Sequence, residues 1–105
     1  MDKKETLISE IKRFKTDLDK YIPIKKMILF GSQARGNMHK WSDVDLIIVS
    51  DKFRNKKPYK RIRGFYDYWN IDKPVDFLCY TPEEFNKLKK QITIVKSAVE
   101  HGIEI

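Results

Sequence analysis

The segment VDLIIVS, residues 44–50, constrains the fold more than any other part of this sequence. It is β-branched and almost entirely apolar, so both of its faces need cover, and it predicts the central strand of a layered structure. IKKMILF, residues 24–30, is bounded by Pro23 and Gly31 and predicts a second buried strand. PVDFLCY, residues 74–80, predicts a third strand that opens on a tolerated proline.

Helical patterns alternate with these strands. Apolar residues recur at spacings of three and four between residues 3 and 20 and predict an amphipathic helix. A similar stripe predicts a second helix from about Pro58 to Trp69, which Gly64 weakens. Thr81-Pro82-Glu83-Glu84 has the cap, the early proline and the third-position glutamate that mark the start of another helix.

The last helical pattern contains the β-branched residues of ITIV, 92–95, which are expected to divide it into two pieces. Gly102 is expected to end it and to leave IEI as a short extended tail. The order of elements therefore predicts a single domain over residues 1–105, of class α/β (α+β). We expect a small mixed sheet with helices packed mainly on one side.

The amino-terminal segment and the single cysteine bear on the cellular compartment. Residues 1–20 alternate charged and apolar side chains, and no run approaches the ~20 apolar residues of a membrane span. Cys79 cannot form an internal disulfide and lies in an apolar strand pattern, so a buried thiol is expected. We therefore expect a cytoplasmic protein without a membrane segment.

The net charge of +7 comes from one segment. Residues 51–63, DKFRNKKPYKRIR, hold seven Lys or Arg and one Asp, or +6, and the rest of the chain holds 15 basic and 14 acidic groups, or +1. Three interpretations stay open: a solvated loop, a docking surface for an acidic partner, or a surface that attracts a triphosphate or RNA. Nucleic-acid binding is thus an alternative that the sequence does not favour.

Three aspartates are the candidate catalytic residues. Asp43 and Asp45 are separated by one residue at the start of the predicted central strand, so their side chains point the same way. Carboxylates this close repel each other unless a cation neutralises them, and their oxygens suit Mg²⁺ or Mn²⁺. Asp76 lies inside another apolar strand, where a carboxylate is costly without a metal or hydrogen-bond partners. His39 and His101 lack partners at metal-ligand spacing and are expected at the surface.

A turn after the first predicted strand offers a phosphate site. Gly31-Ser32 opens a helical turn over residues 33–35. Backbone N–H groups, a hydroxyl and a positive helix terminus at such a turn can hold a phosphate, and Arg35 could add a cation. Gly31, Ser32 and Arg35 are therefore candidate phosphate ligands.

Together these motifs resemble the signature of a known family. Phe30-Gly31-Ser32, ten further residues, Asp43-Val44-Asp45 in a hydrophobic strand and Asp76 on a later strand match the pattern of the DNA polymerase beta-like nucleotidyltransferase superfamily. Within it, the chain resembles the minimal nucleotidyltransferases over most of its length. Each motif alone is weak, but their order and their place at strand ends make the combination specific.

The resemblance implies transfer of a nucleoside monophosphate, AMP from ATP, to an acceptor hydroxyl with release of pyrophosphate. Asp43, Asp45 and Asp76 would be catalytic and would bind metal, two Mg²⁺ ions or Mn²⁺ in their place. Asp76 would also help to deprotonate the acceptor. The Gly31-Ser32 turn and Arg35 would bind the phosphates of the nucleotide, at an active site near the sheet edge.

The resemblance also implies a partner. Larger superfamily members carry an extra domain that binds the acceptor or the base, and without it a partner chain or a homodimer must help to form the pocket. Many minimal nucleotidyltransferases are paired with a small helical HEPN protein, an RNase-type toxin, and act as its antitoxin by transferring AMP to a toxin tyrosine. A small-molecule hydroxyl, an RNA end and a binding antitoxin without catalysis are the alternatives.

Overall fold

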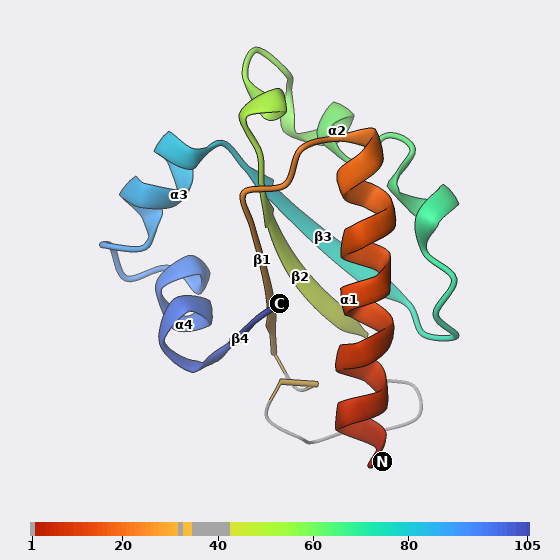
Figure 1. Cartoon of the computed structure of the whole chain (residues 1–105). Helices are drawn as coiled ribbons and strands as arrows, with labels where there is room; N and C mark the ends of the chain where they lie inside the picture. Colours follow the sequence, from red (N-terminus) through yellow and green to blue (C-terminus); the bar gives the residue numbers. More distant parts are fainter. Residues whose placement is uncertain (1, 32, 35–42) are drawn as a thin grey trace.

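A mixed four-stranded sheet lies at the centre of the protein (Figure 1). The structure is a computed structural model and describes residues 2–31, 33–34 and 43–105. The strands, in the spatial order β3-β2-β1-β4, are β1 (Lys26–Phe30), β2 (Val44–Val49), β3 (Val75–Tyr80) and β4 (Ile103–Glu104). β1 is antiparallel to β2 and β4, and β2 is parallel to β3. The central position predicted for residues 44–50 is confirmed, as is the mixed α/β (α+β) class.

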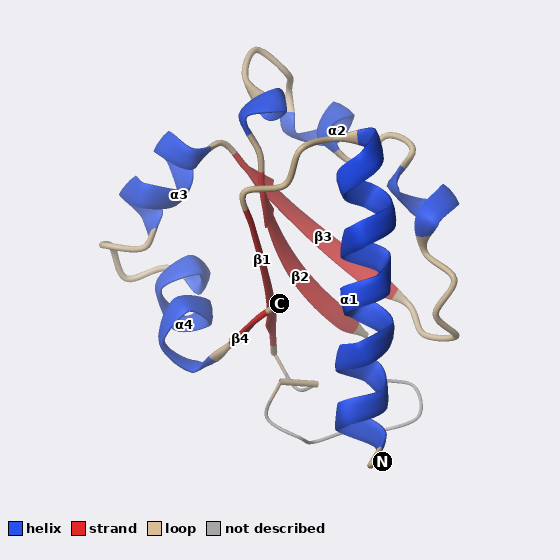
Figure 2. Ribbon diagram, viewed as in Figure 1, coloured by secondary structure: helices blue, strands red, loops and turns tan. Residues whose placement is uncertain are grey.

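Helices cover both faces of this sheet (Figure 2). One face carries α1 (Lys3–Tyr21), α2 (Pro58–Arg61) and the 3-10 helices η1 (Asp51–Phe53) and η2 (Phe65–Tyr68). The other face carries α3 (Pro82–Leu88) and α4 (Ile94–His101). Most helical residues therefore lie on the α1 face, as predicted, and a smaller helical layer covers the opposite face.

The side chains of β2 alternate between two hydrophobic cores. Leu46 and Ile48 pack in a buried cluster with residues of α1. Ile47 and Val49 pack in a second cluster with residues of α3 and α4. Every residue of β2 is buried except Asp45, which is partly exposed. Because side chains alternate along a strand, Asp45 lies on the α4 side of the sheet.

The predicted continuous helix over residues 58–69 is wrong. α2 ends at Arg61, and Gly64 then adopts φ +87°, a left-handed conformation that glycine tolerates, before η2 begins. Two rings of the predicted apolar stripe are exposed, Tyr59 by 67% and Tyr66 by 54%. Helical spacing of aromatic residues misleads here because a glycine in the middle of the segment redirects the chain.

The chain after β3 follows the sequence prediction. α3 begins with a capping box, in which the Glu84 N–H donates to the Thr81 hydroxyl at 3.2 Å and the Thr81 N–H donates to the Glu84 carboxylate at 2.8 Å. The helical pattern then divides, and the loop between α3 and α4 leaves Ile92 fully exposed. Gly102 ends α4, and the predicted tail becomes β4, which pairs with β1.

Cys79 lies buried on β3. Burial raises the pKa of its thiol to about 12, so the thiol is protonated at neutral pH, and the predicted buried cysteine is confirmed. No helix in the described part of the chain combines the length and the apolar character that crossing a membrane requires.

Candidate active site

Two of the predicted catalytic carboxylates are brought side by side by the pairing of β2 with β3. The strands run parallel, and their register pairs Asp45 with Asp76. Asp76 shares its sheet face with Leu78, as Asp45 does with Ile47, and both of these apolar residues belong to the core beneath α3 and α4. Both carboxylates therefore face the α4 side, at the end of the sheet where β1 finishes.

Repulsion between carboxylates is evident at Asp45. The pKa of Asp45 is raised above its usual value, first by burial and then by the negative charges of Asp76 and Asp43. Asp43 lies immediately before β2 and is exposed. No ion pair joins any of the three to another residue of the described ranges. That part of the chain therefore supplies no cation to offset this negative charge.

Gly31 lies against the Asp45 carboxylate. It follows β1 with φ +78°, in the left-handed region that L side chains disfavour. A Cβ atom on Gly31 would lie 2.5 Å from the Oδ2 atom of Asp45, far inside van der Waals contact. Phe30, the residue before it, pairs with Asp45 in the ladder between β1 and β2. Glycine is therefore required both by the backbone conformation and by the carboxylate.

A cavity of about 460 Å³ opens between this end of the sheet and α4. Asp45, Asp76 and Gly31 line it from the sheet, and Ser97 and His101 line it from α4. The remaining lining residues are Phe30, Phe77, Leu78, Ile94, Ala98 and Gly102. An apolar cavity with a few converging polar groups has the composition of a small-molecule binding site.

The role of α4 in this cavity is not predicted by local sequence patterns. The sequence predicts His101 only as a surface residue, and its side chain is 69% exposed, but it also lines the cavity. Gly102 allows the close approach of α4 to β1, because a Cβ atom there would lie 2.8 Å from the Leu29 carbonyl oxygen. The signal that could have indicated this wall is the extended tail, since its pairing with β1 draws the end of α4 toward the carboxylates.

The structure brings together part of the predicted metal site. Asp45 and Asp76 line the cavity, whereas Asp43 is not among the lining residues. Within residues 2–31, 33–34 and 43–105, no three His, Cys, Asp or Glu side chains are grouped closely enough to hold a metal ion. Asp45, which is partly exposed, and Asp76, which is exposed, nevertheless provide hard oxygen ligands without a described counter-cation, so the donor chemistry fits a divalent cation such as Mg²⁺.

Ser32 and Arg35, the other predicted phosphate ligands, lie outside the described residues. Their roles stay predictions. Gln33 and Ala34, between them, are buried.

The family of this chain follows from its similarity to known proteins. A sequence model with the description "Nucleotidyltransferase domain" matches residues 11–102. The chain belongs to this nucleotidyltransferase family. The matched range includes Gly31, Asp45 and Asp76, so the carboxylate cavity lies within the nucleotidyltransferase domain.

Two relatives extend this result. The nucleotidyltransferase is 27% identical over 97 residues to the "Probable protein adenylyltransferase MntA" of Haemophilus influenzae, an alignment that covers 90% of this chain and 85% of that protein. Its fold is similar to the crystal structure of a Sulfolobus solfataricus protein assigned as a nucleotidyltransferase, with a TM-score of 0.59, 18% identity, and coverage of 99% of this chain and 87% of the other. The predicted resemblance to minimal nucleotidyltransferases is confirmed.

Proposed function

We propose that this nucleotidyltransferase transfers AMP from ATP to a hydroxyl group of another protein. The observation that carries the proposal is the pairing of Asp45 with Asp76 beside Gly31, in a cavity of about 460 Å³. Carboxylates whose charges repel each other are costly to the fold, and such residues gather at functional sites. Similarity to a protein named as a protein adenylyltransferase supports AMP as the transferred group and a protein as the acceptor.

The reaction is a substitution at phosphorus. The acceptor oxygen forms a bond to the α-phosphorus of ATP, the bond from that phosphorus to the oxygen that bridges to the β-phosphorus breaks, and pyrophosphate leaves with the electron pair. The proton of the acceptor hydroxyl passes to a base. We assign this role to Asp76, which lines the cavity and reaches it from a rigid strand.

Asp43, Asp45 and Asp76 are the residues that would hold a divalent metal, Mg²⁺ or Mn²⁺, with two ions implied by the family resemblance. A bound metal supplies positive charge that offsets the triphosphate and the charge that develops in the transition state. Binding a cation would also relieve the repulsion from Asp76 and Asp43, which adds to burial in raising the pKa of Asp45. By the family resemblance, the backbone N–H groups at the Gly31-Ser32 turn, with Ser32 and Arg35, would contact the phosphates.

We further propose that the acceptor is a tyrosine of a HEPN-type toxin, with this chain as its antitoxin in a hetero-oligomer. The proposal rests on the resemblance to minimal nucleotidyltransferases. The cavity is lined by Ile94 of α4, whose apolar side chain is 54% exposed and offers an acceptor protein an apolar contact. A homodimer that completes the pocket is the alternative assembly.

Transfer of label from ATP carrying a radioactive α-phosphate tests the function, with Mg²⁺ or Mn²⁺ and with or without the protein encoded by the adjacent gene. We expect label on that protein. Asp45→Asn and Asp76→Asn should each lower transfer by a factor on the order of 10³, because each removes charge that acts on the reacting phosphate. Asp72→Asn is the matched control, since Asp72 is an exposed aspartate outside the cavity, and it should transfer at the native rate.

Each part of the proposal has its own contrary result. If Asp45→Asn still neutralises the partner while the native protein transfers no label, the chain is a binding antitoxin without catalysis. Label on RNA or on a small molecule, and none on protein, would refute the acceptor and leave the enzyme class intact. Native turnover in Asp76→Asn would refute its role as the base.

A further inference from the structure

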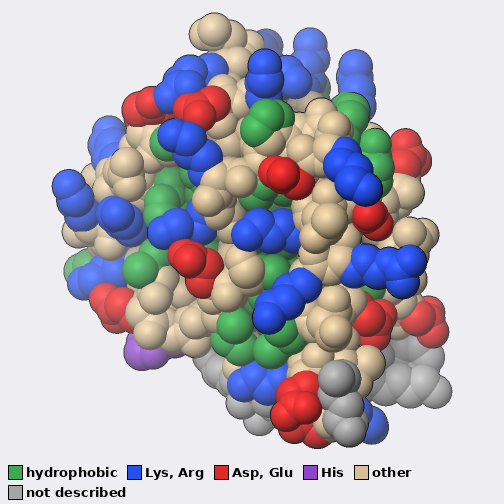
Figure 3. Space-filling model, viewed as in Figure 1, with side chains coloured by type: hydrophobic (Ala, Val, Ile, Leu, Met, Phe, Trp, Pro, Cys, Tyr) green, Lys and Arg blue, Asp and Glu red, His purple; other side chains and the backbone are tan. Residues whose placement is uncertain are grey.

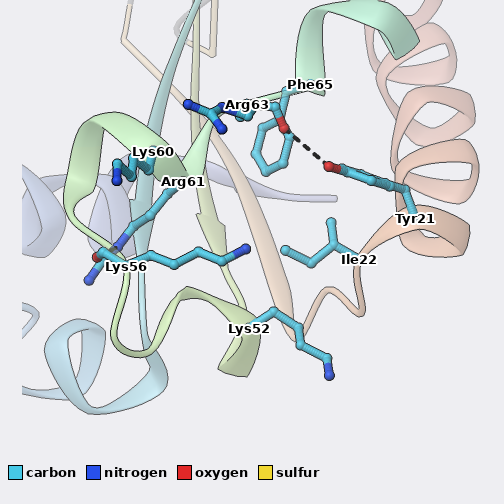
Figure 4. A pocket seen from close by; sticks show the side chains of 8 residues that line it. All are labelled: Tyr21, Ile22, Lys52, Lys56, Lys60, Arg61, Arg63 and Phe65. Atoms are coloured by element: carbon cyan, nitrogen blue, oxygen red, sulfur yellow. Dashed lines mark hydrogen bonds between the residues drawn. The ribbon is translucent and has the colours of Figure 1, made fainter.

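A second cavity lies at the opposite end of β2 from Asp45. It has a volume of about 310 Å³ and opens between the end of α1 and the segment that runs from η1 to η2. Its cationic lining includes Lys52, Lys56, Lys60 and Arg63, with Tyr21 and Phe65 as aromatic walls (Figure 4). Lys and Arg side chains gather along this upper edge of the molecule (Figure 3).

Arg61 fixes the shape of the basic segment, residues 51–63. Its side chain is 7% exposed, and it donates to the carbonyl oxygens of Lys56 and Cys79, both at 3.0 Å. It also donates to both carboxylate oxygens of Glu84, at 2.6 and 3.2 Å. These bonds tie the segment to β3 and α3, so the cations around the cavity are presented on an anchored part of the fold.

Tyr21 forms the opposite wall. Its hydroxyl donates to the Arg63 carbonyl oxygen at 3.4 Å, and its ring stacks on Tyr68 with centroids 5.6 Å apart. Gly64 makes room for this ring, because a Cβ atom there would lie 3.1 Å from the Tyr21 hydroxyl oxygen. Figure 4 shows Tyr21 on one side of the cavity and Lys56 extended across it from the other side.

Five cations line the cavity, and four of them, Lys52, Lys56, Lys60 and Arg63, have no acidic partner within the described residues, whereas Arg61 is paired with Glu84. Three carboxylates on neighbouring segments are neutralised by other cations, in the pairs Asp51 with Lys25 and Arg54, Glu83 with Arg54, and Glu84 with Arg61, whereas Asp67 on η2 is exposed and is in none of the ion pairs of the described ranges. None of the ion pairs in the described ranges includes Lys52, Lys56, Lys60 or Arg63. Like charges around a hollow with low-dielectric walls concentrate a positive potential, which attracts a polyanion.

The residue types favour a nucleic acid over an acidic protein. Lys is depleted in protein–protein interfaces, whereas Lys and Arg together provide the sequence-independent contacts to a phosphate backbone. Tyr59 and Tyr66 are next in sequence to the lining residues Lys60 and Phe65 and are exposed by 67% and 54%, although the Tyr66 ring also contacts Phe77, so both offer ring surface on which unpaired bases stack. We propose that the basic cavity and these tyrosines bind a single-stranded nucleic acid, at a site separate from the carboxylate cavity.

Fluorescence anisotropy with labelled 12-nucleotide oligouridine RNA and oligothymidine DNA tests the proposal over a series of salt concentrations. The triple variant Lys52→Gln/Lys56→Gln/Lys60→Gln should bind at least tenfold more weakly, and its salt dependence should fall by about two in the slope of log K against log salt. Tyr59→Ala should weaken binding about tenfold through lost stacking. These side chains are exposed, so the variants should fold as the native protein does.

The matched control is Lys3→Gln/Lys12→Gln/Lys90→Gln, which removes the same charge from exposed positions away from the cavity. It should change the affinity less than twofold. Asp45→Asn should bind the oligonucleotides as the native chain does, which separates this site from the transfer site whatever the outcome of the transfer assay. Binding of either oligonucleotide supports the proposal, and their relative affinities distinguish RNA from DNA.

Three results would overturn it. The first is no binding of either oligonucleotide at about 50 mM salt, where the counterion-release contribution is large. The second is equal weakening in the two triple variants, which would indicate attraction by net charge alone. The third is displacement of the oligonucleotide by polyglutamate at matched charge, which would identify the cavity as a docking surface for an acidic protein.

Discussion

The charged residues at the two ends of β2 differ in how they are paired. At the end that carries Asp45, carboxylates lie close together and the pKa of Asp45 is raised, with burial as the main cause. At the other end, Arg61 donates to Glu84, and this hydrogen bond lowers the pKa of the Glu84 carboxyl. The unpaired carboxylates at the first end oppose folding and favour the binding of a cation. The ion pair of Arg61 with Glu84 at the second end holds the basic segment to the sheet.

Each end also has a glycine in the left-handed region of backbone conformation. Gly31 has φ +78° and Gly64 has φ +87°. A Cβ atom at Gly31 would meet the Asp45 carboxylate, whereas one at Gly64 would meet the Tyr21 hydroxyl. The same backbone requirement therefore occurs beside two different cavities, which makes the two positions a matched pair for mutation.

Among the changes that compare the two ends, the largest expected effect is on transfer in Gly31→Ala. The new methyl group must displace the Asp45 carboxylate, and misplacement of a catalytic group by about 1 Å can cost roughly 10²-fold in rate. Gly64→Ala has the same kind of backbone strain, on the order of 1 kcal/mol, but should keep the native transfer rate. The α-phosphate transfer assay, with circular dichroism to monitor folding, measures both. Equal losses in the two variants would mean that backbone strain, and not carboxylate position, decides the rate.

The next effect in size is on stability in Arg61→Met. The change removes four hydrogen bonds from a buried guanidinium and leaves the Cys79 carbonyl oxygen and Glu84 without this donor. The free energy of unfolding should fall by about 2 kcal/mol, less than the roughly 3–5 kcal/mol of a broken fully buried pair, because Glu84 is partly exposed and can be hydrated. Urea denaturation measures it. Lys60→Met, at an exposed neighbour, should stay within about 0.5 kcal/mol of native, and a similar loss there would contradict the anchoring role.

The smallest effect is a pH dependence of opposite sign at the two ends. The pKa of Asp45 is raised above 3.8, so the free energy of unfolding falls as pH rises through the interval from 3.8 to the raised pKa. Asp45→Asn should therefore be more stable than native at pH 7, by a few tenths of a kcal/mol because solvent screens a partly exposed carboxylate, and the gain should vanish as pH falls toward 3.8.

Glu84→Gln should behave in the reverse way. The pKa of Glu84 lies below 4.5, so its contribution is present above pH 4.5 and is lost as pH falls through the lowered pKa. The variant should be less stable than native at pH 7 and should approach it in acid. Thermal unfolding between pH 3 and 7, without added divalent ions, tests both variants. The same sign of change in both would remove the electrostatic contrast between the two ends.

Local sequence patterns predicted most of the elements. The apolar runs at 44–50 and 74–80 became β2 and β3, apart from one terminal residue of each, because burial on both faces demands that composition. The capping signature at Thr81 became a capping box, since it depends only on residues within one turn. The prediction of one helix over 58–69 is wrong. The spacing of its aromatic residues is helical, but Gly64 adopts a left-handed conformation that ends the helical path.

The sequence by itself determined the family of this protein, since the order and spacing of Gly31, Asp45 and Asp76 resemble the nucleotidyltransferase signature before any fold is known. Tertiary structure decided what these residues meet. The register that pairs Asp45 with Asp76, the wall that α4 adds, and the pairing of Arg61 with Glu84 all join residues far apart in the chain. Such contacts depend on how the strands and helices pack together, and the periodicity of a single segment does not predict them.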